Sequence, residues 1–262
     1  MQELFFYKKA GAMLKEERHK LILKEINLHN KVHVTDLRDQ LVVSEDTIRR
    51  DLIELAEAGL ILKVHGGAMS KTFHYPFNGQ GQVYAQEAKQ VIADKVIKLF
   101  KNGMFIIMEG GTTIMEIARK IPEDLQATFL TVSPQVAITL AEHENLEVIT
   151  IGGRLAKNDI IHTGASVINE LSGIMADLCV IGTNGISVKD GLTDSDWEVV
   201  QVIKAIVRSA KKVAVVSIAE KFETVQKIKI SEITNVDYLI TELPPDSPVL
   251  SPYGGNERPI LL

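Results

Sequence analysis

Cysteine is almost absent from this chain of 262 residues, which contains only Cys179. A single cysteine excludes an intramolecular disulfide, and its place in the apolar run LCVIG favours a buried, inert thiol. The seven histidines are scattered along the chain. With so few clustered ligands we expect neither a metal site nor another cofactor.

Long hydrophobic runs are absent too. No stretch approaches the roughly 18 apolar residues of a membrane span, and no start resembles a secretory signal. We therefore expect a cytoplasmic protein with no membrane partner. Residues 1–12 are set apart because YKKAGA resembles the linker left by recombination cloning, and Met13 is the expected native start.

The sequence has no excess of positive charge. Its formal net charge is −5, and residues 13–72 carry ten Lys or Arg and ten Asp or Glu. This balance excludes a protein coated in basic residues for nucleic-acid binding. Any contact with DNA must therefore depend on where individual charges lie.

Motifs of nucleotide binding and of hydrolytic catalysis are missing. The chain has no Gly-x-x-x-x-Gly-Lys-Ser/Thr sequence, and EGGTT at residues 109–113 lacks the third glycine of the dinucleotide fingerprint. Ser133 precedes a proline and has no Gly-x-Ser-x-Gly frame around it. These absences argue against conventional nucleotide chemistry and against a serine hydrolase, and we expect the protein not to be an enzyme.

Helical patterns dominate the N-terminal part of the chain. The apolar spacing predicts a first helix over 15–27, followed by a short extended segment that ends at Val34. Thr35 is expected to cap a second helix, and Ser44 a third helix that stops at Gly59. Two short helices joined by about three residues form a helix-turn-helix.

The third helix has one apolar face and one polar face. At roughly 100° per residue, Ile48, Leu52 and Leu55 face the core and Arg50 lies almost opposite. Such a helix suits the major groove, where arginine pairs with guanine and hydroxyl groups reach bases or phosphates. The alternative is that RRD at 49–51 forms a solvated face with salt bridges inside the helix.

A short alternating strand follows the third helix. GLILKVHGGAM places Lys63 and His65 on one side and ends in a tight glycine turn, as a wing beside a recognition helix would. Glu45 is ambiguous, since its carboxylate could accept a hydrogen bond from cytosine or simply favour the helix dipole. The candidate DNA-binding residues are Thr35, Ser44, Glu45, Asp46, Thr47, Arg49, Arg50, Lys63, His65 and Gly66.

Residues 87–262 predict a second, larger domain. A linker at 71–86 precedes it and contains proline, aromatics and glycines without periodicity. Apolar runs such as MFIIM, TFLTV and LCVIG then alternate with helical segments, which predicts a mainly parallel sheet covered on both faces. The expected fold class is α/β, with a winged helix-turn-helix domain at 13–70 followed by an α/β domain for effector sensing and oligomerisation.

Glycine-rich or polar turns follow four of the strands, namely EGGTT, SPQ, GGR and GTNGIS. Ligands of parallel sheets bind at the carboxyl ends of strands, so these turns can converge on one pocket. In EGGTT the backbone N–H groups of the glycines and the hydroxyls of Thr112 and Thr113 suit a phosphate at a helix N-terminus. The alternative is that Gly110 and Gly111 form only a tight turn and Thr112 caps the helix.

The segment VSEDTIRRDLIELAEAGLILKVHGGAM, with RHKLILKEI before it, resembles the N-terminal domain of the DeoR family of bacterial transcriptional regulators. The resemblance implies a regulator whose recognition helix begins at Ser44 and whose wing carries His65, Gly66 and Gly67. The resemblance extends over residues 87–241, which correspond to the DeoR effector domain. This domain is similar to pentose-phosphate isomerases and CoA-transferase-like proteins. That domain usually responds to a phosphorylated sugar.

Within the second domain, EGGTT resembles the family's phosphate loop and ADLCVIGTNGISVKDGLT its second sugar-contacting region. The family often has Asp in place of Glu109 and Asn184 and a lysine in place of Ile203. AEKF replaces its Ser-x-Lys-Phe, although Lys221 remains. The candidate effector-binding residues are Gly110, Gly111, Thr112, Thr113, Ser133, Gly153, Asn184, Gly185, Thr193 and Lys221.

These features together predict a DNA-binding transcriptional regulator, a repressor of a carbohydrate-utilisation operon that responds to a phosphorylated sugar or a related metabolite. Its expected partners are double-stranded operator DNA, the effector and further copies of the chain. A dimer or tetramer is expected because one DNA-binding domain without net positive charge binds weakly. The alternatives are a sugar-phosphate isomerase or transferase-like enzyme with a DNA-binding module, and an architectural DNA-binding protein that needs no effector.

Overall fold

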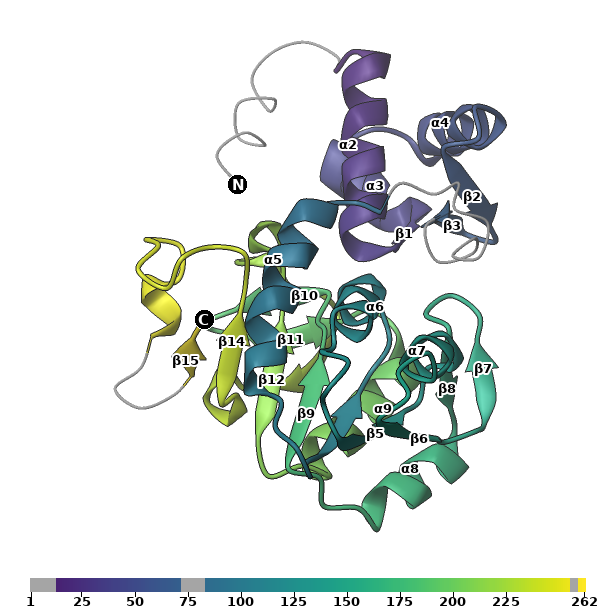
Figure 1. The fold of residues 1–262 in the computed structure, drawn as a ribbon. Helices are drawn as coiled ribbons and strands as arrows, with labels where there is room; N and C mark the ends of the chain where they lie inside the picture. The colour runs from purple at the N-terminus through teal and green to yellow at the C-terminus, as the bar shows by residue number, and fades with distance from the viewer. Residues whose placement is uncertain (1–12, 72–82, 255–258) are drawn as a thin grey trace. The chain divides into compact units, whose positions relative to one another are not determined.

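The computed structural model describes residues 13–71, 83–254 and 259–262. The chain divides into two compact units, Met1–Tyr84 and Ala85–Leu262 (Figure 1). The expected cloning linker at 1–12 and most of the expected interdomain linker at 71–86 lie outside the described residues. Within the described ranges, no helix is both long and apolar enough to cross a membrane.

The first unit, over its described residues, combines three helices with a three-stranded antiparallel sheet. Its elements are α2 (Lys15–His29), β1 (Lys31–His33), α3 (Val34–Leu41), α4 (Glu45–Glu57), β2 (Ile61–Val64) and β3 (Gly67–Ser70). The strands pair in the order β1-β3-β2. Ile22 and Ile26 of α2 pack with Ile48 and Leu52 of α4 in the core, which confirms the apolar faces predicted for both helices.

Local signals determine both ends of α4. The hydroxyl of Ser44 accepts a hydrogen bond from the backbone N–H of Thr47 at 3.2 Å and caps the helix, as predicted. Gly59 lies just beyond the helix with φ +74°, a conformation that glycine adopts at little cost. Three residues separate α3 from α4, so the predicted helix-turn-helix is confirmed.

The predicted start of α3 is wrong by two residues. The helix begins at Val34 and its N-cap is His33, not Thr35. β1 pairs with β3 as far as His33, so the chain passes from the sheet into the helix without an intervening residue. The hydroxyl of Thr35 donates to the neighbouring carboxylate of Asp36 at 3.4 Å, and Thr35 lies exposed in the first helical turn.

β2 and β3 form the predicted hairpin. Val64 pairs with Gly67 across a two-residue turn in which Gly66 has φ +76°. A Cβ on Gly67 would lie 1.9 Å from the carbonyl oxygen of Val32, so only glycine fits where β3 meets β1. Lys63, on the hairpin, is exposed.

The second unit is an α/β domain. Its elements are α5 (Gln86–Val96), η2 (Ile97–Leu99), β4 (Phe105–Met108), α6 (Thr112–Arg119), β5 (Ala127–Thr131), α7 (Pro134–Leu140), β6 (Leu146–Thr150), β7 (Arg154–Ala156), β8 (Ile161–Thr163), α8 (Ala165–Ser172), β9 (Leu178–Ile181), β10 (Gly185–Ser187), β11 (Gly191–Asp194), α9 (Trp197–Arg208), β12 (Val213–Val216), η3 (Ala219–Lys221), β13 (Ile228–Ser231), η4 (Ile233–Asn235), β14 (Tyr238–Ile240), η5 (Ser251–Tyr253) and β15 (Ile260–Leu261). Over the described residues, seven strands form one parallel sheet in the order β15-β14-β12-β9-β4-β5-β6, which confirms the predicted sheet.

The direction of the chain through this sheet reverses between β4 and β9. From β4 the chain continues to β5 and β6 on one side, and it then returns to β9, β12 and β14 on the other. Helices α6 and α7 pack together, as do α8 and α9 (Figure 1). Right-handed crossovers place these two pairs on opposite faces of the sheet. Open α/β sheets bind ligands at the carboxyl ends of the strands that flank such a reversal.

Two smaller sheets have no counterpart in the sequence-based expectation. β7 and β8 form an antiparallel hairpin, and β10, β11 and β13 form a three-stranded antiparallel sheet. Each of these strands has only three or four residues, which is too short for a clear alternation. Asn184 lies in the short connection from β9 to β10. Asp194, the last residue of β11, is hydrogen-bonded to it.

Candidate functional site

The candidate DNA-binding residues lie on the surface of α3, α4 and the hairpin. Glu45 and Thr47 are half-buried, and the other candidates are exposed. On α4 the apolar residues Ile48, Leu52 and Leu55 are buried, so the polar residues of the helix face away from the core. This arrangement has the amphipathic form of a helix that enters the major groove.

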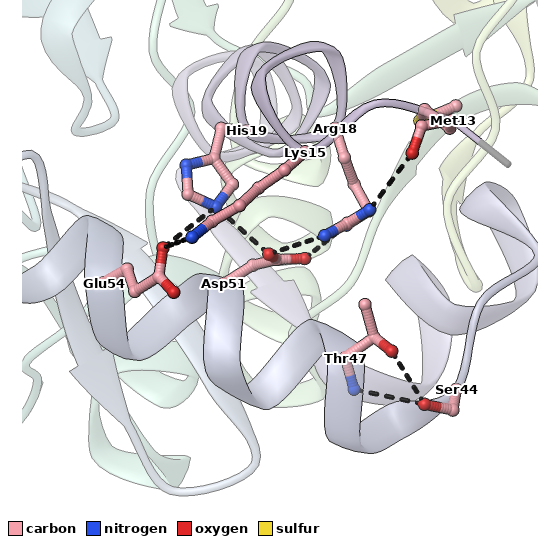
Figure 2. Close-up of polar contacts among 8 residues, drawn as sticks. All are labelled: Met13, Lys15, Arg18, His19, Ser44, Thr47, Asp51 and Glu54. Carbon is pink, nitrogen blue, oxygen red and sulfur yellow. Dashed lines mark hydrogen bonds and ion pairs between the residues drawn. The ribbon is translucent and has the colours of Figure 1, made fainter.

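The hydroxyl groups at the start of α4 are already hydrogen-bonded. The Oγ of Ser44 lies 2.9 Å from the Oγ1 of Thr47 and also accepts from the Thr47 backbone N–H (Figure 2). Both side chains therefore stabilise the beginning of the helix. Their contact with DNA stays a prediction.

The two arginines of TIRRD have different surroundings. Arg49 donates to Glu45 at 2.7 Å and to Asp46 at 3.4 Å, both within α4. Arg50 is exposed, and no hydrogen bond or ion pair joins it to a described residue. Salt bridges inside the helix therefore account for Arg49, whereas none of the residues that the structure describes accepts from Arg50.

Asp51, the third residue of RRD, is buried and not solvated. It accepts hydrogen bonds from Arg18 of α2, at 2.5 Å from Nε and 2.9 Å from Nη2 (Figure 2). The Nε2 of His19 lies 3.1 Å from the same carboxylate. One turn further along α4, Glu54 pairs with Lys15 at 2.5 Å. These contacts join α2 to α4 and hold the expected recognition helix in its orientation.

In the second unit, Glu109 lies at the reversal of the sheet. It directly follows β4, and its buried Oε2 accepts a hydrogen bond at 2.8 Å from the backbone N–H of Gly182, which follows β9. Burial is the main cause that raises the pKa of Glu109 to about 8, and the charge of Asp194 adds to it. The carboxyl group is therefore largely protonated at neutral pH.

A chain of hydrogen bonds joins Lys221 to Asp194. The Nζ of Lys221 donates to the carbonyl oxygen of Thr183 at 2.8 Å and to the Oδ1 of Asn184 at 3.3 Å. The Nδ2 of Asn184 then donates to the Oδ2 of Asp194 at 2.9 Å. Burial lowers the pKa of Lys221 to about 8, although the charges of Asp194 and Glu109 oppose this shift.

Lys89 of α5 brings a second lysine to this place. It is 6% exposed, and burial, helped by the positive charge of Lys221, lowers its pKa to about 7. An anionic ligand would favour the charged form of both lysines, because it replaces the hydration that burial removes. Below, the switch-point cluster denotes Lys89, Glu109, Asn184, Asp194 and Lys221.

The EGGTT turn leads from this cluster into α6. The N-cap of α6 is Gly111, with φ +111°, and no described side chain caps the helix. The alternative in which Thr112 is the cap is therefore wrong, since Thr112 is already inside the helix. Uncapped N–H groups at a helix start bind anions readily, and Thr112 and Thr113 are half-buried there.

Two candidate hydroxyls have structural partners. Ser133 caps α7 through the backbone N–H of Val136 and donates to the carbonyl oxygen of Ile160 at 3.1 Å. The Oγ1 of Thr193 accepts from the backbone N–H of Gln226 at 2.8 Å. Their role towards an effector stays a prediction, with a structural role beside it.

Three candidate glycines mark places of close packing. A Cβ on Gly110 would lie 2.5 Å from a methyl carbon of Ile161, and one on Gly185 would lie 2.7 Å from the Oγ1 of Thr193. Gly153 packs against Val167 of α8 and against β8, not against the switch-point cluster. Gly110 and Gly185 therefore directly follow residues of the cluster, Glu109 and Asn184, whereas Gly153 packs elsewhere.

Sequence reasoning missed Lys89 and Asp194. Lys89 had a detectable signal, because it shares one helical face with Ile92, Ala93 and Val96, all of which are buried. A lysine on an apolar face is unusual without a function or a partner. Asp194 lies at the end of a four-residue strand and carries no such periodic signal.

The solved structures that resemble the chain do so in part and share little sequence with it. One is eIF2B delta from Chaetomium thermophilum, with a TM-score of 0.44, 18% identity and coverage of 61% of this chain and 57% of that chain. Another is ribose 5-phosphate isomerase A from Methanocaldococcus jannaschii, with a TM-score of 0.39, 17% identity and coverage of 52% and 54%. In both cases the chain spans between half and two thirds of the other protein.

Curated relatives match almost the whole chain. The transcriptional regulator GlpR of Haloferax volcanii is 33% identical over 88% of this chain and 91% of its own length. The glycerol-3-phosphate regulon repressor of Escherichia coli is 30% identical over 91% and 95%. The repressor GlcR of Bacillus subtilis is 30% identical over 89% and 91%.

Two domain families match the chain, one in each of its two units. The DeoR-like helix-turn-helix domain matches residues 18–73, and the DeoR C terminal sensor domain matches residues 84–243. The first covers the helix-turn-helix with α4, and the second covers the switch-point cluster and every strand of the parallel sheet except β15. The chain belongs to the DeoR family of transcriptional regulators.

Proposed function

We propose that the protein is a cytoplasmic repressor of a carbohydrate-utilisation operon and that a phosphorylated sugar controls it. The observation that carries the sensor half is a pair of lysines in the switch-point cluster, the buried Lys89 and the half-buried Lys221, together with the uncapped start of α6 that follows Glu109. The observation that supports the DNA half is the exposed Arg50 on the polar face of α4. Further copies of the chain supply the second DNA-binding unit, because residues 13–72 have no net positive charge.

The protein is not an enzyme in this proposal, because no carboxylate of the switch-point cluster is free to act as a base. Asp194 already accepts hydrogen bonds from Asn184 and from the backbone N–H groups of Ser195 and Asp196. Asn184 is an amide whose oxygen and nitrogen are both hydrogen-bonded. Glu109 has a pKa of about 8 and is largely protonated at neutral pH. Isomerisation of a sugar phosphate needs a positioned base in its unprotonated form. Turnover of a pentose phosphate by the purified protein would contradict this part of the proposal.

Arg50→Ala is expected to lose roughly 1–3 kcal/mol of sequence discrimination, because the arginine has unused donors that suit guanine. The measurement is fluorescence anisotropy of the full chain with a duplex selected from a random pool and with its point variants. Arg49→Ala is the matched control, because Arg49 is engaged by Glu45 and Asp46. It should leave the discrimination between the selected duplex and its point variants unchanged. Equal discrimination by wild type and Arg50→Ala would remove Arg50 from the recognition surface.

Affinity for a phosphorylated sugar is expected to fall as the pH rises from 7 to 9. Lys89 and Lys221 have pKa values of about 7 and about 8 and lose positive charge over this range. Glu109, with a pKa of about 8, gains negative charge. All three changes weaken the binding of an anion. Calorimetric titration at several pH values, with a ligand found by thermal-shift screening of sugar phosphates, measures the trend, and a flat profile would exclude these groups from the binding site.

A further inference from the structure

An ion-pair network covers the start of α4 and includes a residue of α3. The Oε2 of Glu45 accepts from Arg49 at 2.7 Å, and its Oε1 accepts from Arg38 of α3 at 3.1 Å. Arg38 also pairs with Asp39 at 2.7 Å, and Arg49 with Asp46 at 3.4 Å. One carboxylate thus divides its two oxygens between two guanidinium groups from the two helices of the helix-turn-helix.

The charge balance of this network does not favour DNA. Two arginines face three carboxylates, those of Asp39, Glu45 and Asp46. As long as the pairs stay formed, the network has an excess of negative charge and disfavours a phosphate backbone, although it contains two arginines. The pairs are partly exposed, since the side chains of Arg38 and Arg49 are 41% and 55% exposed. Exposed pairs are weak, so a well-placed phosphate can displace the carboxylate.

We propose that Glu45 determines specificity by holding Arg38 and Arg49 away from DNA phosphates until an operator is bound. This inference rests on the proposed DNA-binding function and adds Arg38 to the residues that contact DNA. On random DNA, α4 lacks base contacts that keep it close to the backbone, and the arginines stay with Glu45. On the operator, base contacts such as that of Arg50 hold α4 in the groove, and the two guanidinium groups exchange carboxylate for phosphate.

The geometry favours this role over the two roles considered for Glu45 from the sequence. Both oxygens of Glu45 already accept charged hydrogen bonds, which hold the carboxylate between Arg38 and Arg49. The negative charge of Glu45 in the first turn of α4 also interacts favourably with the helix dipole, but this interaction does not involve Arg38. A change confined to non-specific binding distinguishes the proposed role.

The test is the salt dependence of DNA binding by the full chain with Glu45→Gln. Freeing two arginines adds up to two phosphate contacts, each of which steepens the slope of log affinity against log salt by about 0.9. For a random-sequence duplex, Glu45→Gln should therefore bind more tightly than wild type at low salt. It should also lose about tenfold more affinity between about 50 and 200 mM salt. Fluorescence anisotropy measures both quantities.

Glu57→Gln is the matched control. It removes the same charge from the last residue of α4, where no ion pair with a described residue is formed. This variant should show a small gain in affinity and the wild-type slope. The triple variant with Glu45→Gln, Arg38→Gln and Arg49→Gln should return to the wild-type slope, because the freed cations are gone.

Two outcomes would overturn the inference. Equal slopes for Glu45→Gln and Glu57→Gln would show that the arginines are not held back. If Glu45→Gln lost the preference for the operator sequence at a single base pair, Glu45 would be assigned to contact with that base instead. If the wild-type chain binds no duplex at any salt, the proposed function fails as well. Binding by wild type with equal variant slopes removes only this inference. Thermal unfolding of each variant checks that the first unit is folded.

Discussion

Asp51→Asn is expected to lower the free energy of unfolding of the first unit by about 3–5 kcal/mol. Asp51 is 2% exposed and is the partner of Arg18, whose side chain is 11% exposed. The substitution removes the negative charge and leaves the largely buried guanidinium group of Arg18 without an anionic partner. His19 loses the same carboxylate, so the junction between α2 and α4 is weakened on both sides.

The loss of Asp51 should also abolish operator binding, because α4 is no longer held at a defined angle to α2. Urea unfolding followed by circular dichroism measures stability, and anisotropy measures binding. Asp46→Asn is the control, since Asp46 is an exposed carboxylate on the same helix with a single weak pair to Arg49. It should change stability by less than about 1 kcal/mol. A comparable loss in both variants would show that burial of Asp51 does not matter.

A second pair of variants separates charge from packing at this junction. Replacing Arg18 by Met and Asp51 by Leu together removes both charges and retains similar volume. This double variant is expected to recover much of the stability lost in Asp51→Asn. It should recover operator binding only if the orientation of α4 depends on the presence of a contact and not on its charge. Failure to recover stability would show that the hydrogen-bond geometry itself is required.

Lys89→Met is expected to abolish the response to the effector and leave the unliganded protein at least as stable as wild type. At a ligand concentration of 100 times the dissociation constant, the ligand should stabilise wild type by about 2.7 kcal/mol. It should not stabilise the variant. The pKa of Lys89 is lowered to about 7 in the fold, so its charged form is destabilised by burial. That cost is complete below pH 7 and declines as the pH rises towards 10.5, the ordinary lysine value. Methionine avoids it.

Thermal-shift measurements with and without the sugar phosphate test this expectation. Lys98→Met is the matched control, because Lys98 is an exposed lysine in η2, the element that follows α5. It should retain the full shift. A full shift in Lys89→Met would move the anion site away from the switch-point cluster. A large loss of stability without ligand would show that Lys89 is mainly structural.

Elements with a clear period were predictable, and those that depend on contacts between distant segments were not. α4 follows from Ser44, Gly59 and an apolar face that repeats along thirteen residues. The sheet of β10, β11 and β13 has short strands whose only partners lie elsewhere in the chain, so local pattern carries no information about it. The misplaced cap at Thr35 has the same origin, because pairing of β1 with β3 decides where α3 begins.

By itself, the sequence determined the order of two domains, the helix-turn-helix and the parallel arrangement of the main sheet. Apolar periods, capping residues and glycines act over a few residues, and such local effects can be inferred from residue spacing. Only the tertiary structure decided which charges are buried and with which partners. Asp51 meets Arg18 from 33 residues away, and Lys89 shares its surroundings with Lys221. Burial depends on every segment that packs around a group, so the surroundings of these charges could be known only from the fold.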